Sequence, residues 1–299
     1  MAPISSTRLT AQQFIRTFEQ DPKAGASVNF AKFLRKGIEW SVILITPLCE
    51  IPMEGYKLAK KCIHWFRPES SATLVTPESL DAFHPTLEPE KILRLKENLT
   101  ALFALKDKIA HGANLSFFYD ESATVCSVSL QGHIALDPSF AEITKEEAEF
   151  VFAHELSHFH HKDILKTLAL KTFSIAIPIS AFFGHSFLAY YVSYAALHNM
   201  NYILSRHCVR RADQDAIKLL NSNLGAILTF YRNSHELAVV ALVIDKKHQS
   251  RFEKLNFSGK IEVIKYLSKN GICPEDPTHP ATWERLKSAE AYRPAAKQD

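Results

Sequence analysis

The residues best suited to chemistry are the run His-Glu-Leu-Ser-His at positions 154–158. If this run is helical, His154 and His158 lie one turn apart on one face, where their imidazoles can bind the same metal ion. Zinc accepts neutral imidazole nitrogen, and a catalytic zinc keeps one position open for water, which it makes acidic near neutral pH. Glu155 then stands beside that water as a general base. The run therefore predicts metal-assisted hydrolysis.

A five-residue pattern can also arise by chance in a chain with 14 histidines, so its surroundings matter. Residues 144–147 read Thr-Lys-Glu-Glu, a capping box in which Thr144 and Glu147 cap the first turn of a helix. Three segments rich in Val, Phe and Ile precede this helix and predict a small sheet: 115–119, 124–130 and 133–136. A strand, a turn and a capped helix are the setting that the metal motif needs. A strand beside the helix can also pair with an extended substrate backbone.

Length and composition exclude several classes of protein. The 299 residues can form one large domain or a domain with an appendage. A formal net charge of +3 gives no strongly basic surface, so no nucleic-acid partner is expected. The five cysteines are scattered and odd in number, which indicates reduced thiols and not a disulfide framework. Residues 1–36 are polar and mixed, so no cleaved secretory signal is expected.

The sequence predicts an N-terminal region, 1–85, followed by a catalytic domain, 86–299. The N-terminal region is expected to hold a helix around 11–19, a short apolar segment at 38–53 and a linker rich in Ser, Thr and Pro at 67–86. A spanning helix needs roughly 20 apolar residues, so the apolar segment is expected to be buried or interfacial, with a full membrane crossing as the alternative. The catalytic domain is expected to begin with a helix over 89–111, followed by the sheet.

The most apolar part of the chain, residues 165–204, follows the metal motif. It divides at Gly184-His185 into two segments of about 16 to 19 residues, which predict a helical hairpin. The hairpin either dips into a membrane or lies buried in protein, because each half is short for a crossing and carries polar residues. We expect membrane association from this segment.

Three further histidines near the motif are not expected to bind the metal. His161 shares the face of His154 but lies about 10 Å farther along the helix axis, too far to share one ion. His160, His161 and His185 are therefore expected to be solvated or to support the ligands from outside. The run His-Glu-Leu-Ala-Val at 235–239 lacks the second histidine and predicts only an amphipathic helix.

Taken together, these features resemble the zinc metallopeptidase family that includes the HtpX-like heat-shock membrane proteases and the CAAX prenyl proteases. The resemblance extends over residues 114–292. It implies an α+β fold of the zincin type, predominantly helical, with a small sheet and an apolar helical hairpin insertion. The pieces that carry it occur in the family's order: the strand before 144–147, the run 154–158 with Asp163 after it, the apolar insertion, Ser205-Arg206 leading to Arg211-Ala212-Asp213, and Thr278-His279-Pro280 followed by Arg285-Leu286.

Roles for the residues of the metal helix follow from this resemblance. His154 and His158 would bind Zn²⁺, and Glu155 would activate water. Asp213 would orient a metal-bound imidazole. The implied activity is a zinc-dependent endopeptidase that cleaves unfolded or membrane-linked polypeptides.

The C-terminal segment is implied to complete the site. By analogy with its family position, His279 would steady the oxyanion of the tetrahedral intermediate. Arg285 would brace the site. The whole protein would be membrane-associated.

One position departs from the family pattern. The third zinc ligand there is a Glu four residues before the Asp, and Val209 stands in its place. Valine has no donor atom, whereas catalytic zinc normally has three protein ligands and a water. A substitute could be Asp213, or His207 or Cys208 if a helix break turned them by about 200° or 100°. Otherwise the chain is a catalytically impaired relative that acts as a binding or regulatory protein.

Overall fold

The computed structural model describes residues 9–21, 73–80, 82–83, 85, 87–109, 115–120, 127–129, 131–183, 187–242, 246–272 and 279–294. The chain forms two compact units. One comprises residues 1–45 and 230–288, and the other comprises residues 46–229 and 289–299. The metal motif at 154–158 lies in the second of these, the larger unit. The apolar segment predicted at 38–53 and His185 lie outside the described residues.

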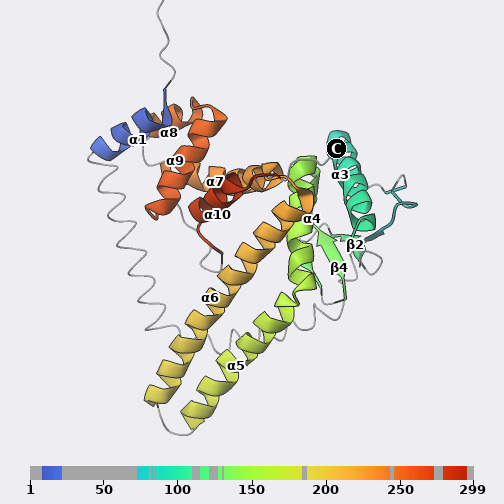
Figure 1. Cartoon of the computed structure of the whole chain (residues 1–299), viewed down its shortest axis with the longest axis vertical. Coiled ribbons are helices and arrows are strands. Elements are labelled where there is room, and N and C mark those ends of the chain that lie inside the picture. The colour runs from blue at the N-terminus through green and yellow to red at the C-terminus, as the bar shows by residue number, and fades with distance from the viewer. Residues whose placement is uncertain are drawn as a thin grey trace, which may run out of the picture. The chain divides into compact units, whose positions relative to one another are not determined.

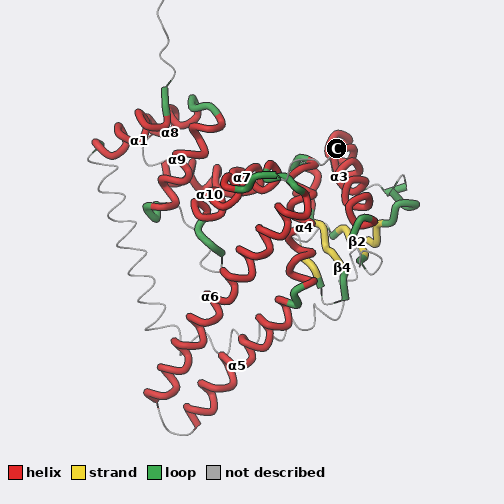
Figure 2. Tube along the Cα trace, in the orientation of Figure 1, coloured by secondary structure: helices red, strands yellow, loops and turns green. Residues whose placement is uncertain are grey.

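A four-stranded sheet forms one layer of the larger unit (Figure 2). β2 (Ser116–Tyr119) and β4 (His133–Leu136) pair in parallel at its centre. β1 (Thr73–Val75) pairs antiparallel with β2, and β3 (Ser127–Val128) pairs antiparallel with β4. β2 and β4 therefore lie close to the predicted strands at 115–119 and 133–136. β3 falls inside the predicted segment 124–130. β1 was not predicted, because it lies in the Ser-, Thr- and Pro-rich stretch that indicated a linker.

Helix α3 (Pro89–Asp107) and the sheet enclose the main apolar core. Leu95, Leu99 and Leu102 form the buried stripe of α3, at the spacing of an amphipathic helix. Alternate residues of the central strands point into the same core, as the pleat of a strand requires. They are Phe117, Tyr119, Ile134 and Leu136. This core fixes the sheet against the helices that carry the chemistry.

Helix α4 (Lys145–His160) carries the metal motif and begins at the predicted cap. The Thr144 hydroxyl accepts a hydrogen bond from the Glu147 N–H at 3.3 Å, and Glu147 Oε2 accepts one from the Thr144 N–H at 2.9 Å. The helix ends where Lys162 adopts a positive φ of 54°. That turn lets the next helix start immediately at Asp163. A short 3₁₀ helix, Pro138–Ala141, leads from β4 towards the cap.

Helices α5 (Asp163–Phe183) and α6 (Phe187–Leu220) pack against each other, and α6 also packs against α4 (Figure 1). The two predicted apolar segments are therefore helical, but α6 continues without a break through residues 205–220. Among the described helices, none combines the length and the apolar run that a membrane crossing requires. Several large apolar side chains of α5 and α6 are nevertheless exposed: Phe173, Ile177, Leu188, Val192, Met200 and Ile203.

The smaller unit is helical in its described part. It contains α1 (Ala11–Gln20), most of α7 (Leu224–Leu242), α8 (Lys246–Glu253), α9 (Phe257–Lys269) and most of α10 (Thr282–Ala291). Phe14 and Phe18 of α1 pack their rings against the buried His248, with centroids 6.0 and 5.2 Å away. The His248 Nε2 also lies 3.1 Å from Asp21 Oδ2. These contacts tie the predicted N-terminal helix to a segment more than 200 residues later in the chain.

The first turn of α7 belongs to the larger unit, where Gly225 packs on the start of α4. A Cβ atom at Gly225 would lie 2.0 Å from the Glu146 carbonyl oxygen and 2.9 Å from the Phe150 Cβ. Only glycine permits this approach, so the beginning of the metal helix is held by direct backbone packing.

Candidate active site

The imidazoles of His154 and His158 face each other from successive turns of α4. Their Nε2 atoms are 3.1 Å apart. Two imidazole nitrogens bound tetrahedrally to one zinc ion, at about 2.0–2.1 Å each, would lie about 3.3 Å apart. The observed separation therefore fits two ligands of one ion.

Each imidazole has a carboxylate at its other nitrogen. The His158 Nδ1 lies 3.0 Å from Asp163 Oδ2, within a hydrogen bond. The His154 Nδ1 lies 2.9 Å from Asp213 Oδ1, in an ion-pair contact whose angle is not that of a directed hydrogen bond. A proton held on Nδ1 leaves the Nε2 lone pair available for a metal. The 3.1 Å contact between the two Nε2 atoms is an N–H···N hydrogen bond in one pair of tautomers; with both protons on Nδ1, two lone pairs converge, and this donor set suits one cation.

Asp163 is ionised and firmly held. Although burial alone would raise its pKa, hydrogen bonds from Arg211, His158 and Lys166 hold the pKa of Asp163 well below its usual range. The Arg211 guanidinium contacts both carboxylate oxygens, with 2.6 Å to Oδ2, and the Lys166 Nζ lies 3.3 Å from Oδ1. Asp163 is therefore a charged acceptor for the His158 Nδ1–H.

His158 is in the protonation state that a metal needs. Burial is the largest cause of its shift, and the neighbouring His154 acts in the same direction, so that the pKa of His158 falls to about 4. Its contacts with Asp163 and Asp213 oppose the shift without reversing it. At neutral pH the His158 imidazole is thus uncharged, the state in which an Nε2 lone pair can bind a metal.

Glu155 lies between the histidine pair and the edge of the sheet. Part of the residue is exposed, but burial of its carboxyl group raises the pKa of Glu155, against the opposing effects of His154 and the Val128 N–H. The adjacent Ser129 N–H donates to the His133 carbonyl of β4 at 2.8 Å, so the Val128 N–H points to the other side of the strand. Among the described strands β3 is an edge, and Glu155 borders it.

None of the proposed substitutes for a third ligand joins the pair. Because α6 is regular across 205–213, it is not bent to turn residues 207 and 208. His207 is exposed and Val209 is buried. Burial, followed by the charge of Asp163, raises the pKa of the buried Cys208 thiol, which disfavours a thiolate ligand. Among the described residues, no group of three His, Cys, Asp or Glu side chains is arranged to hold a metal.

His279 and Arg285 lie in the smaller unit. His279 is exposed. The Arg285 guanidinium carbon lies 4.1 Å from the centroid of the Phe230 ring, in a cation–π contact. The roles of His279 and Arg285 beside the metal pair remain predictions.

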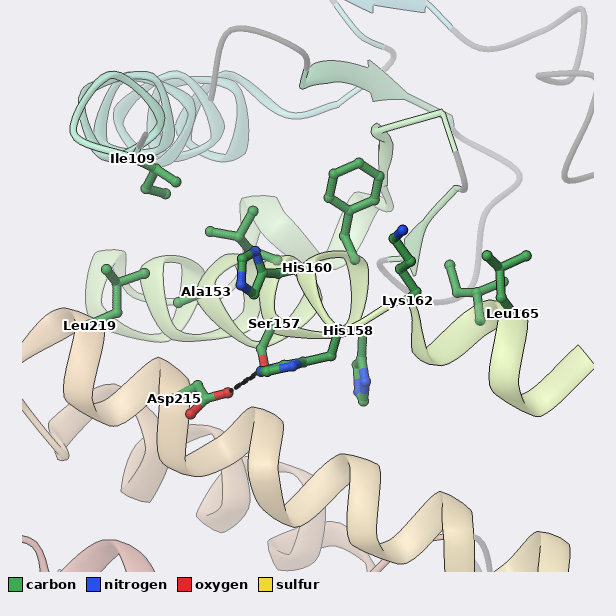
Figure 3. Close-up of a pocket in the computed structure, with 13 residues that line it drawn as sticks. Ile109, Ala153, Ser157, His158, His160, Lys162, Leu165, Asp215 and Leu219 are labelled. Carbon is green, nitrogen blue, oxygen red and sulfur yellow. Dashed lines mark hydrogen bonds and ion pairs between the residues drawn. The ribbon is translucent and has the colours of Figure 1, made fainter. Parts of the chain in front are cut away.

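A second polar cluster, which the sequence did not indicate, connects α4 to α6. The Ser157 hydroxyl donates to Asp215 Oδ2 at 2.9 Å, and the His161 Nε2 lies 3.0 Å from the same oxygen. The cluster lines a cavity of about 660 Å³ (Figure 3). His161 was expected to be solvated or to support the ligands from outside, and the contact with Asp215 gives it a partner on α6. The only sequence signal was the spacing of Ser157 and His161, one helical turn apart.

A capped helix bearing paired imidazoles, with carboxylates behind them and a sheet edge beside them, is the architecture of a metallopeptidase. Residues 78–293 match peptidase family M48, and the chain belongs to this family. No curated protein sequence and no solved structure matches the chain. The metallopeptidase interpretation of the sequence is thus confirmed at the level of the family. The closer resemblance to the HtpX-like and CAAX proteases stays a prediction.

The ion pair behind His158 gives the first prediction. Arg211→Met leaves the Asp163 carboxylate buried without its main partner, and we expect the free energy of unfolding to fall by about 3 kcal/mol. Asp163→Asn should have a similar effect, and the double variant should lose less than the sum of the two, because it leaves no unpaired charge. Urea unfolding at pH 7 measures the free energy of unfolding of the native protein, the two single variants and the double variant. The exposed pair of Lys145 and Glu149 is the control, since Lys145→Met should change stability by less than about 0.5 kcal/mol. Strictly additive losses would contradict the coupling.

The missing third ligand gives the second prediction. Val209 lies one turn before Asp213 on α6, so Val209→Glu would supply a carboxylate where the family has one. We expect the affinity for zinc, measured by competition with a chromophoric chelator, to increase at least about tenfold. Val209→Gln controls for the added polar volume and should have a smaller effect. An unchanged affinity in Val209→Glu would mean that a third ligand is already in place.

Proposed function

We propose that this protein is a zinc-dependent endopeptidase in which His154 and His158 hold the metal. The observation that carries the proposal is the 3.1 Å separation of their Nε2 atoms, with a carboxylate beside each Nδ1. With both protons on Nδ1, the two Nε2 lone pairs converge at the separation that a metal site requires. Membership of peptidase family M48 supports the same assignment.

Glu155 is the proposed general base. When bound, zinc supplies a Lewis acid that lowers the pKa of water and polarises a carbonyl. Glu155 takes a proton from water as the hydroxyl oxygen bonds to the scissile carbonyl carbon, and gives that proton to the amine nitrogen as the C–N bond breaks. Burial raises the pKa of the Glu155 carboxyl, and a nearby cation lowers it again. These opposing effects suit a group that must both accept and release a proton.

The proposed substrate is an unfolded or membrane-linked polypeptide. An extended chain can add to an exposed strand, and β3, which borders Glu155, is an edge of the described sheet. Folded proteins rarely present such extended segments, so unfolded chains fit best. By resemblance, His279 steadies the oxyanion and Arg285 braces the site in this proposal.

Val209 supports a second candidate function. With two imidazoles and no third ligand among the described residues, the protein could be an impaired relative that binds polypeptide without cleaving it. The two functions differ in zinc content and cleavage, which the next experiment measures.

The test of the proposed function compares the protein with Glu155→Gln. We expect close to one zinc per chain by elemental analysis and cleavage of casein. Glu155→Gln should retain the zinc but slow cleavage by about 10²- to 10⁴-fold, because it removes the base and leaves the ligands. Glu146→Gln, exposed on the same helix, is the control and should behave as the native protein. Absence of both zinc and cleavage in the native protein would refute the enzyme and leave the binding function.

Membrane association is proposed from the exposed apolar side chains of α5 and α6, among them Phe173, Leu188 and Ile203. Apolar side chains of this kind can enter the boundary of a bilayer without crossing it. We expect the untagged protein to sediment with membranes, and Leu188→Glu/Ile203→Glu to shift it towards the supernatant. Complete recovery of the native protein in the supernatant without detergent would contradict this.

A further inference from the structure

We propose that Asp215 is a positioning residue for the metal pair, because it fixes the last turn of α4, and with it His158, against α6. The inference rests on the proposed role of His154 and His158 as metal ligands. Asp215 Oδ2 accepts the Ser157 hydroxyl at 2.9 Å and lies 3.0 Å from the His161 Nε2. His158 lies between these two residues in the chain. One carboxylate oxygen thus contacts residues on both sides of His158 in the chain.

The last turn of α4 needs such support. The final carbonyl groups of any helix lack intrahelical partners, so its last turn frays most easily. His158 lies in that turn, two residues before the helix ends at His160. The chain then turns at Lys162, with its positive φ of 54°, and continues into α5. Movement of this turn would displace the His158 imidazole relative to His154.

Apolar packing on one side of the turn is incomplete. Leu156, Phe159 and Ile164 pack partly buried against the main core, and they also border the cavity of about 660 Å³ that lies along this part of α4. Side chains that border a cavity lack contacts on that side and constrain the backbone less. The polar contacts with Asp215 therefore carry more of the positioning here.

Two carboxylates of α6, those of Asp213 and Asp215, contact α4 at different residues. Ala212 and Ala216 are fully buried, and such small side chains allow two helices to approach closely. On a regular helix, Asp213 and Asp215 project on opposite sides of this alanine ridge. Asp213 contacts His154, whereas Asp215 contacts Ser157 and His161. The two carboxylates thus fix both turns of the metal pair, and ligand groups must be held to within about 0.5 Å to bind a metal well.

A contribution to position can be separated from a contribution to stability. The side chains of His161 and Asp215 are 34% and 35% exposed, and exposed ion pairs add little to the free energy of unfolding. In addition, a carboxylate near the C-terminus of a helix is disfavoured by the helix dipole. Removal of Asp215 should therefore change the geometry of the metal pair more than the stability of the fold.

The experiment loads the metal-free full chain with Co²⁺ and follows its visible absorption. Asp215→Ala should weaken cobalt binding about tenfold, the lower end of the range for residues that support a ligand from outside, with little change in the unfolding midpoint. Asp215→Glu keeps the carboxylate and should restore most of the affinity. Gln214→Ala, exposed on the same helix, should match the native protein.

Hydrogen exchange of the metal-free protein tests the same contact without a metal. Amides of residues 157–162 should exchange faster in Asp215→Ala than in the native protein, and Ser157→Ala, which removes one donor, should give a smaller change in the same direction.

Unchanged exchange and unchanged cobalt affinity in Asp215→Ala would overturn the inference and leave the proposed function intact. Failure of the native protein to bind Co²⁺ or Zn²⁺ would refute the proposed function, and the exchange rates would still decide whether Asp215 fixes the turn. If Asp215→Ala does not fold, Ser157→Ala decides both measurements.

Discussion

The convergence of two imidazoles, each with a carboxylate beside its Nδ1, is the arrangement on which the site depends. His154 and His158 hold their Nε2 atoms 3.1 Å apart, a distance that suits either an N–H···N hydrogen bond or a shared cation. The fixing groups are carboxylates behind each ring, and the ionised Asp163 is itself held by Arg211. The organisation of α4, α5 and α6 follows from the need to bring these charges behind one helix.

The larger unit fixes α4 along its whole length by different means at each end. At its start, a capping box and the close approach of Gly225 determine where the helix begins. Its middle packs against the apolar core formed by α3 and the sheet. At its end Leu156 and Phe159 pack only partly buried against that core, and contacts with charged residues of α5 and α6 add to this packing. The end of the helix that carries His158 is thus held by electrostatic contacts as well as by apolar packing.

Val209 makes this positioning more important. A site with three protein ligands tolerates some movement of each, whereas a site with two has fewer bonds to compensate for a displaced ring. Val209 is buried in a regular part of α6, and neither His207 nor Cys208 is turned towards the pair. In the proposed site, metal binding would therefore depend on the groups behind the imidazoles more than it does in a site with three ligands.

The sequence by itself determined the local features. Capping at Thr144, the helical spacing of His154 and His158, the stripe of α3 and the strand at 133–136 all depend on neighbouring residues, so they can be read from the chain. It did not reveal β1, whose short segment becomes a strand only by pairing with β2. Nor did it reveal the pairing of Asp163 with Arg211 or the partners of Asp215, since these contacts join residues about 50 positions apart. Only the packing of α6 against α4 and α5 decided them, because a charged side chain takes its partner from whatever the tertiary fold brings within hydrogen-bond distance.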